Sequence, residues 1–112
     1  GRDLVSGIPK TLRISSVEIS EALSEPLDRI VAALKTALEK TPPELAADIV
    51  ERGIVMMGGG ALLRDLGHLF KEETNLPINV VEDPLTCVVL GTGKILKNIQ
   101  DYEKILMKTS RL

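Results

Sequence analysis

Apolar residues recur at three- and four-residue steps through much of this chain, and two short apolar runs interrupt that spacing. Ser15 and Glu18 form a capping-box pattern, after which the apolar stripe continues as far as Leu38. This pattern predicts one long amphipathic helix. Pro26 removes a main-chain hydrogen bond inside it, but the stripe keeps its phase, so we expect a kink rather than a restart. Thr41-Pro42-Pro43 is expected to end the helix.

The segments on either side of this helix are short. Residues 1–14 combine a Ser6-Gly7 turn signal and a proline with alternating polar and apolar residues, which is typical of an extended arm. A second helix is predicted over Pro43–Arg52, with Gly53 taking left-handed backbone angles beyond its end.

Two apolar runs, residues 54–57 and 78–81, predict strands, the first of them buried on both faces. Gly58-Gly59-Gly60 follows the first run, and helical spacing then extends from Leu62 to Asn75, the expected C-cap. Such a strand-helix-strand unit should place its strands parallel in one sheet through a right-handed crossover. The sequence therefore predicts an α/β fold with several flanking helices.

Asp83-Pro84 predicts the start of a further helix, with Asp83 as its N-cap. Gly91 and Gly93 lie inside this helix and cost roughly 1 kcal/mol each relative to alanine, so we expect another segment to approach it closely. From Asn98 the chain becomes more polar and is interpreted as a terminal helix.

Composition excludes several classes of protein. The chain has 112 residues, of which 44% are hydrophobic, which suits one globular domain with a core but not two domains. A net charge of -2 and only two aromatic residues, Phe70 and Tyr102, argue against a nucleic-acid partner. No apolar run reaches the ~18 residues of a membrane span. The absence of an initiator Met suggests a piece of a longer protein.

The candidate titratable residues offer little chemistry. One cysteine and one histidine cannot supply the protein ligands of a zinc site. Cys87 is interpreted as a small buried hydrophobe in a reduced, cytoplasmic setting, and His68 as a surface residue. Glu82 and Asp83 follow the second strand, where they could contact magnesium or ribose, although the predicted capping role already explains Asp83.

The triple glycine is the most informative local feature. A glycine-rich turn between a strand and a helix lets main-chain N–H groups face a ligand. The alternative is that the glycines serve only to permit a tight turn. No Walker-type phosphate loop follows. Gly58 and Gly60 match the first two positions of a dinucleotide-binding fingerprint, but Leu63 stands where the third Gly or Ala is needed. Glu82 lies at about the distance along the chain where the fingerprint has its ribose-binding acidic residue. The alternatives are a Rossmann-type, nicotinamide-dependent oxidoreductase fragment and a module whose exposed helices dock a partner.

Four long segments, in the same order, resemble the MreB family, the bacterial actin-like proteins that shape rod cells. They comprise residues 1–11, 41–49, 51–64 and 82–93. The resemblance covers about residues 1–97 and leaves the tail from Asn98 unaligned. It implies the fold of actin, sugar kinases and chaperone ATPases, which is ribonuclease H-like and has two lobes around a nucleotide.

The resemblance places this chain in the C-terminal part of the second lobe. It implies an arm over residues 1–15, part of the nucleotide-binding lobe over residues 16–97, and a helical tail over residues 98–112. The segment from Asp83 to Gly93 then resembles the helix at the lobe hinge, where small residues let two helices approach.

The resemblance also implies a ligand and its site. ATP or ADP, with Mg²⁺ in the intact protein, would bind with its ribose and adenine against the glycine-rich turn, formed by Gly58, Gly59, Gly60, Ala61 and Leu62. Intact family members are ATPases, but their phosphate-binding hairpins and catalytic acidic residues have no counterpart in this chain. No catalytic residue is therefore assigned, and hydrolysis by this chain alone is not expected.

The partners implied by the resemblance are other copies of the protein, in a filament at the inner face of the cell membrane, together with the cell-wall elongation machinery and its membrane-anchored adaptors. Membrane contact would come from parts of the protein outside this chain. For the chain itself, unpaired edges of the predicted sheet should favour dimerisation or strand exchange.

Overall fold

The computed structural model describes residues 1–106, which divide into two units, one over residues 1–40 and the other from Thr41 onward. In the first unit, residues 1–10 form a closed loop rather than a fully extended arm. Arg2 and Pro9 pair in an antiparallel bridge, and Asp3 Oδ1 accepts a 2.8 Å hydrogen bond from the Val5 N–H. Residues 10–15 then lead to the first helix without regular secondary structure.

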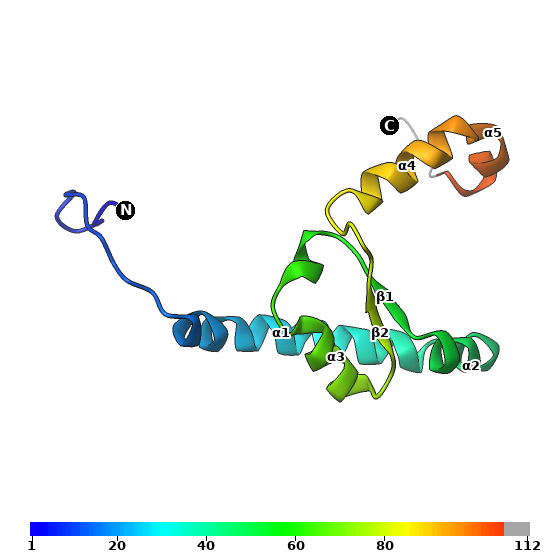
Figure 1. Ribbon diagram of the computed structural model, residues 1–112, viewed down its shortest axis with the longest axis horizontal. Helices are drawn as coiled ribbons and strands as arrows, with labels where there is room; N and C mark the ends of the chain where they lie inside the picture. Colours follow the sequence, from blue (N-terminus) through cyan, green and yellow to red (C-terminus); the bar gives the residue numbers. More distant parts are fainter. Residues whose placement is uncertain (107–112) are drawn as a thin grey trace, which may run out of the picture. The chain divides into compact units, whose positions relative to one another are not determined.

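Helix α1 spans Ser16–Glu39 and is the longest element of the chain (Figure 1). Its capping box is confirmed, because the Glu18 N–H donates to Ser15 Oγ at 3.2 Å and the Ser15 N–H donates to Glu18 Oε2 at 2.7 Å. The helix runs through Pro26 without a restart, as the uninterrupted apolar stripe predicted, and ends two residues before Thr41.

The second unit opens with α2, Pro43–Arg52, whose bounds are those predicted. Gly53 follows it with φ 79° and ψ -163°, so the predicted positive φ is confirmed while ψ lies outside the left-handed helical region. The Ile54 N–H donates to Pro77 O at 2.8 Å. A Cβ at Gly53 would lie 2.2 Å from that oxygen, so only glycine allows the chain to pass so close to Pro77.

A two-stranded parallel sheet confirms the predicted strand-helix-strand unit. Strand β1 spans Ile54–Met56 and β2 spans Ile78–Val80, with Ile54 opposite Ile78. Between them, helix α3, Leu66–Thr74, packs against β2 (Figure 1). Its C-cap is Asn75, which has φ 56° as the cap prediction requires. The hydrophobic core of the unit comes from one strand and one helix, through the buried side chains of Met56, Leu66 and Phe70.

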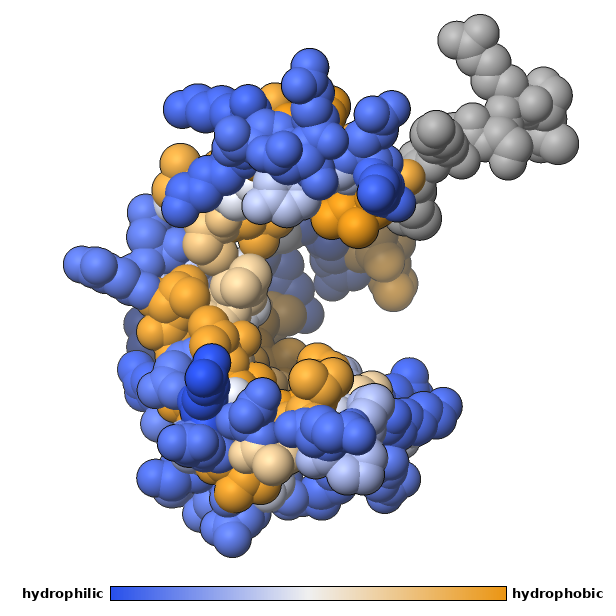
Figure 2. All heavy atoms as spheres, turned by 90° about the vertical axis from the view of Figure 1, so that its right-hand side faces the viewer, coloured by the Kyte–Doolittle hydropathy of each residue, from blue (hydrophilic) through white to orange (hydrophobic). Residues whose placement is uncertain are grey.

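The prediction that the first strand is buried on both faces is wrong. Successive strand side chains point to opposite faces, and Val55, between Ile54 and buried Met56, is 56% exposed. Within residues 1–106, one face of this strand is covered and the other is left open to solvent. Apolar surface is exposed elsewhere as well, as the orange areas in Figure 2 show.

The helix after the second strand begins later than predicted. Helix α4 spans Cys87–Lys97 rather than starting at Asp83-Pro84, and its N-cap, Thr86, makes no side-chain capping bond. Asp83 is therefore not the N-cap. The Pro84 carbonyl oxygen instead accepts a 2.8 Å hydrogen bond from the Gly58 N–H, and Pro84 lies in a turn rather than in a helix.

The polar tail is helical, as predicted, as far as the structure describes it. Helix α5, Ile99–Tyr102, is followed by the 3₁₀ helix η2, Glu103–Ile105, and the rest of the predicted tail, residues 107–112, lies outside the described residues. A Cβ added at Gly91 or Gly93 would meet nothing within 4 Å, so the segment expected to approach α4 closely is not among residues 41–106 of its own unit. None of the described helices is long and apolar enough to cross a membrane.

Candidate functional site

The glycine-rich turn predicted as a site leaves the sheet at the end of β1. Gly58 has φ 85° and ψ 166°, a conformation that residues with a side chain rarely adopt. Gly58 is half-buried, whereas Gly59 and Gly60 are exposed. A Cβ at Gly60 would meet nothing within 4 Å, so the space where a side chain would lie is open.

Main-chain hydrogen bonds hold this turn but do not use all of its donors. The Ala61 N–H donates to Gly58 O, and the Leu63 N–H donates to Gly60 O, both at 3.1 Å. The N–H groups of Gly59 and Gly60 have no acceptor among residues 1–106. The turn therefore presents two neighbouring main-chain donors on residues that have no side chain of their own.

The predicted junction between the glycines and the following helix is wrong in one respect. Ala61 and Leu62 do not begin α3; they belong to the 3₁₀ helix η1, Gly59–Leu62. Asp65 has a left-handed φ of 58°, which interrupts the helical path, and α3 starts only at Leu66. The glycines thus lead into a single 3₁₀ turn instead of the first turn of a long helix.

A second loop, residues 81–86, lies against the glycine turn. It leaves β2 at the same edge of the sheet, because both strands are parallel and end together. The Gly58 N–H donates to the buried Pro84, and a Cβ at Gly59 would lie only 3.1 Å from Leu85 Cδ2. The sequence pattern predicts a helix start at Pro84 and indicates no role in the site for Leu85. The parallel pairing of the two strands was the signal that could have brought these loops together.

The acidic residues of this loop do not form a metal site with neighbouring groups. Glu82 and Asp83 are exposed, and residues 1–106 contain no cluster of three or more His, Cys, Asp or Glu side chains suited to a metal ion. Cys87 is half-buried, with its Sγ 3.3 Å from Pro84 O. His68 is exposed, as predicted, and lies 3.2 Å from Glu72 on the next turn of α3.

Ionisation contributes little at the glycine turn. Residues 58–63 carry no titratable side chain, so recognition there rests on main-chain N–H groups and on shape. The two carboxyl groups with a shifted pKa belong to the first unit. The pKa of Asp3 is lowered mainly by the Val5 N–H, and the pKa of Glu18 mainly by the Ser15 N–H.

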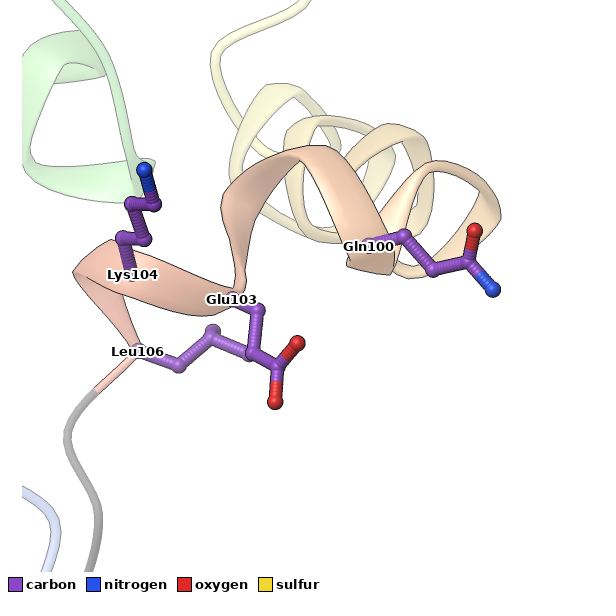
Figure 3. Close-up of a pocket in the computed structure, with 4 residues that line it drawn as sticks. All are labelled: Gln100, Glu103, Lys104 and Leu106. Atoms are coloured by element: carbon purple, nitrogen blue, oxygen red, sulfur yellow. The ribbon is translucent and has the colours of Figure 1, made fainter.

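A separate depression of about 440 Å³ lies at the α5–η2 corner and is lined by Gln100, Glu103, Lys104 and Leu106 (Figure 3). The side chains of Glu103 and Lys104 point in different directions, so they do not converge on one ligand (Figure 3). None of the glycine-turn residues lines it.

Three sequence matches point to the same family. A sequence model of the MreB/Mbl protein family matches residues 1–104. The cell shape-determining protein MreB of Escherichia coli K12 is 58% identical over 99 residues, which cover 88% of this chain and 28% of that protein. The cell shape-determining protein Mbl of Bacillus subtilis 168 is 50% identical over 104 residues, which cover 93% of this chain and 31% of that protein.

Solved structures agree. The crystal structure of MreB 5 of Spiroplasma citri bound to AMPPNP matches with a TM-score of 0.79 and 43% identity, covering 95% of this chain and 32% of that one. The ADP-bound form matches with a TM-score of 0.79 and 42% identity, covering 93% and 32%.

The fold is thus part of an actin-like, ribonuclease H-like lobe of the α/β class, as predicted. The chain belongs to the MreB/Mbl family of cell shape-determining proteins. It spans about a third of the length of these relatives. The oxidoreductase alternative finds no support in any of the matches.

Proposed function

We propose that this chain supplies the adenosine-contacting wall of the nucleotide cleft in an ATP-binding, actin-like protein. The residues assigned to that wall are Gly58, Gly59, Gly60, Ala61 and Leu62. The observation that carries the assignment is the pair of unpaired N–H groups at Gly59 and Gly60 in an exposed turn. The related MreB 5 structures bound to AMPPNP and ADP support it.

The shape of the turn suits a flat, neutral group such as a nucleoside. Without Cβ atoms at Gly59 and Gly60, a ribose or base can approach the peptide planes directly, and the free N–H groups can donate to its oxygen or nitrogen atoms. Leu62, which is 58% exposed, offers apolar surface for the base. Mg²⁺ would be held by the nucleotide's phosphates and by other parts of the intact protein, because residues 1–106 offer no suitable acidic cluster.

Self-assembly and cell-shape control form the second part of the proposal. The intact protein would form filaments at the inner face of the cell membrane and direct cell-wall synthesis through the elongation machinery and its membrane-anchored adaptors. Membership of a cell shape-determining family supports this role. Membrane contact is assigned to parts of the protein outside this chain.

Nucleotide binding can be tested with Gly60→Ala in a full-length protein that contains this chain. Position 60 has open space and no positive φ, so the fold should tolerate the new methyl group. A fluorescent ADP analogue should bind about tenfold more weakly, which corresponds to about 1.4 kcal/mol. Gly67→Ala is the matched control, because it also adds a single methyl group, which would meet Ile78 only at an ordinary 3.6 Å, but it lies in α3. Unchanged affinity in Gly60→Ala would contradict the assignment.

Filament formation needs a separate experiment on the same full-length protein. Light scattering should rise after ATP is added and remain low without nucleotide. A protein that neither binds ATP nor polymerises would contradict the proposed function.

A further inference from the structure

We propose that Leu85, together with the Pro84 carbonyl, is a positioning element for the glycine turn and thereby sets its affinity for nucleotide. This inference rests on the proposed function of Gly58–Gly60. It concerns residues that do not belong to the proposed adenosine wall but lie behind it.

The first contact is the hydrogen bond from the Gly58 N–H to Pro84 O, at 2.8 Å. Pro84 is buried, and its oxygen also lies 3.3 Å from Cys87 Sγ. The Cys87 N–H in turn donates to Asp83 O at 3.2 Å, which closes the turn around the proline. The acceptor that holds Gly58 is therefore itself fixed by two further contacts.

The second contact is made by a side chain. Leu85 Cδ2 lies 3.1 Å from the position of a Cβ at Gly59, whereas a Cβ at Gly58 or Gly60 would meet nothing within 4 Å. Leu85 therefore covers one side of Gly59 and leaves the rest of the turn open for a ligand. Because Leu85 is 67% exposed, it adds little to the core, and its close contact with Gly59 is better explained by support of the turn.

The glycine turn needs such support because it has no side chains of its own to pack. Three consecutive glycines lose more conformational freedom on ordering than other residues do. If the turn were unsupported, this conformational entropy would be lost when nucleotide binds, and the loss would weaken binding. Contacts from residues 84 and 85 fix the turn beforehand, which favours binding without any direct contact with the ligand.

The test is Leu85→Ala in the full-length protein, with Leu45→Ala as its control. Leu45 is the same residue type, is exposed at 55%, and lies in α2. A fluorescent ADP analogue should bind about three- to tenfold more weakly to Leu85→Ala and less than about twofold more weakly to Leu45→Ala. Leu85→Met should recover most of the affinity. Without nucleotide, both alanine variants should melt together, whereas a selectively lower melting temperature for Leu85→Ala would mean a merely structural role and overturn the inference.

A double-variant cycle tests the contact itself. Gly59→Ala should weaken binding because its methyl group presses on Leu85, and adding Leu85→Ala should relieve that pressure. The double variant should therefore bind more tightly than the two single effects predict, and additive effects would overturn the inference. If the wild-type protein binds nucleotide and Gly60→Ala weakens binding while Leu85→Ala binds normally, only this inference fails. If the wild-type protein binds no nucleotide, the proposed function fails with it.

Discussion

At the scale of single residues, four positions with positive φ shape the second unit: Gly53, Gly58, Asp65 and Asn75. Two of them are glycines that the chain path requires for different reasons. Gly53 lies directly against the main chain of Pro77, so position 53 has no room for a side chain. Gly58 has room around it but adopts backbone angles that disfavour a side chain.

Gly53→Ala should destabilise the 112-residue chain by about 2–4 kcal/mol, because the new methyl group would lie only 2.2 Å from Pro77 O and the residue has a positive φ. Chemical denaturation followed by circular dichroism measures this change. Gly60→Ala, which adds the same group in open space, should cost less than about 1 kcal/mol. Equal losses for the two variants would contradict the overlap at Pro77.

The capping box at Ser15 should make the start of α1 sensitive to acid. The Ser15 N–H and then the Ser15 hydroxyl lower the pKa of Glu18 below its ordinary value. The folded chain thus holds this proton less tightly than the unfolded chain does. The stabilisation is complete above the ordinary glutamate pKa and is lost as pH falls through the lowered one.

Carbon-detected NMR titration of the Glu18 carboxyl should show this lowered pKa. In Ser15→Ala the pKa should move back toward the ordinary value, since the hydroxyl is lost and the cap is weakened. A Glu18 that titrates identically in both proteins would show that the capping box does not hold in solution.

At the scale of elements, bounds were predictable where a local signal decides them. The prolines before α2 and the asparagine at the end of α3 fix those ends, because each acts through its own backbone angles. The start of α4 depends instead on a contact between segments distant in sequence. Pro84 is bound to Gly58, and no periodicity within either segment shows that bond.

The candidate site divides in the same way. The glycine turn itself could be located from three consecutive residues after an apolar run. Its supports at Pro84 and Leu85 could not, because they come from a loop about 25 residues further along, and only the parallel pairing of β1 and β2 brings the two loops together. Local patterns thus indicated the surface that faces a ligand, and tertiary contacts determined what holds it in place.

Gly93→Ala should stabilise α4 in the 112-residue chain by about 1 kcal/mol. The substitution removes a helix-interior glycine, and its methyl group would meet nothing within 4 Å. Denaturation of the wild-type and variant chains measures the difference. A loss of stability would instead show that a neighbour contacts this face, as the glycines at 91 and 93 predicted.

At the scale of the whole molecule, the main feature is how little apolar surface is buried. Among the described residues, the buried hydrophobic side chains are Val31, Met56, Leu66 and Phe70. A chain of this length normally buries roughly 65% of the surface that it exposes when unfolded. The chain spans about a third of the length of its relatives. The small core fits this, because the exposed apolar surface is free to pack against more protein.

The isolated chain should therefore self-associate. Each strand of the two-stranded sheet has one unpaired edge, and the open face of β1 carries Val55. Size-exclusion chromatography with light scattering should show a mass that rises with concentration. Val55→Lys should shift the distribution toward the monomer, since it places a charge on that open face. A clean monomer at every concentration would contradict the prediction.

Helix α1 carries one further consequence of its path through Pro26. A proline has no amide hydrogen, so one main-chain hydrogen bond is missing near the middle of this 24-residue helix. Amide protons before and after this gap need not exchange with solvent in one event. The helix is expected to open as two cooperative segments, residues 16–25 and 27–39, each with its own protection against exchange.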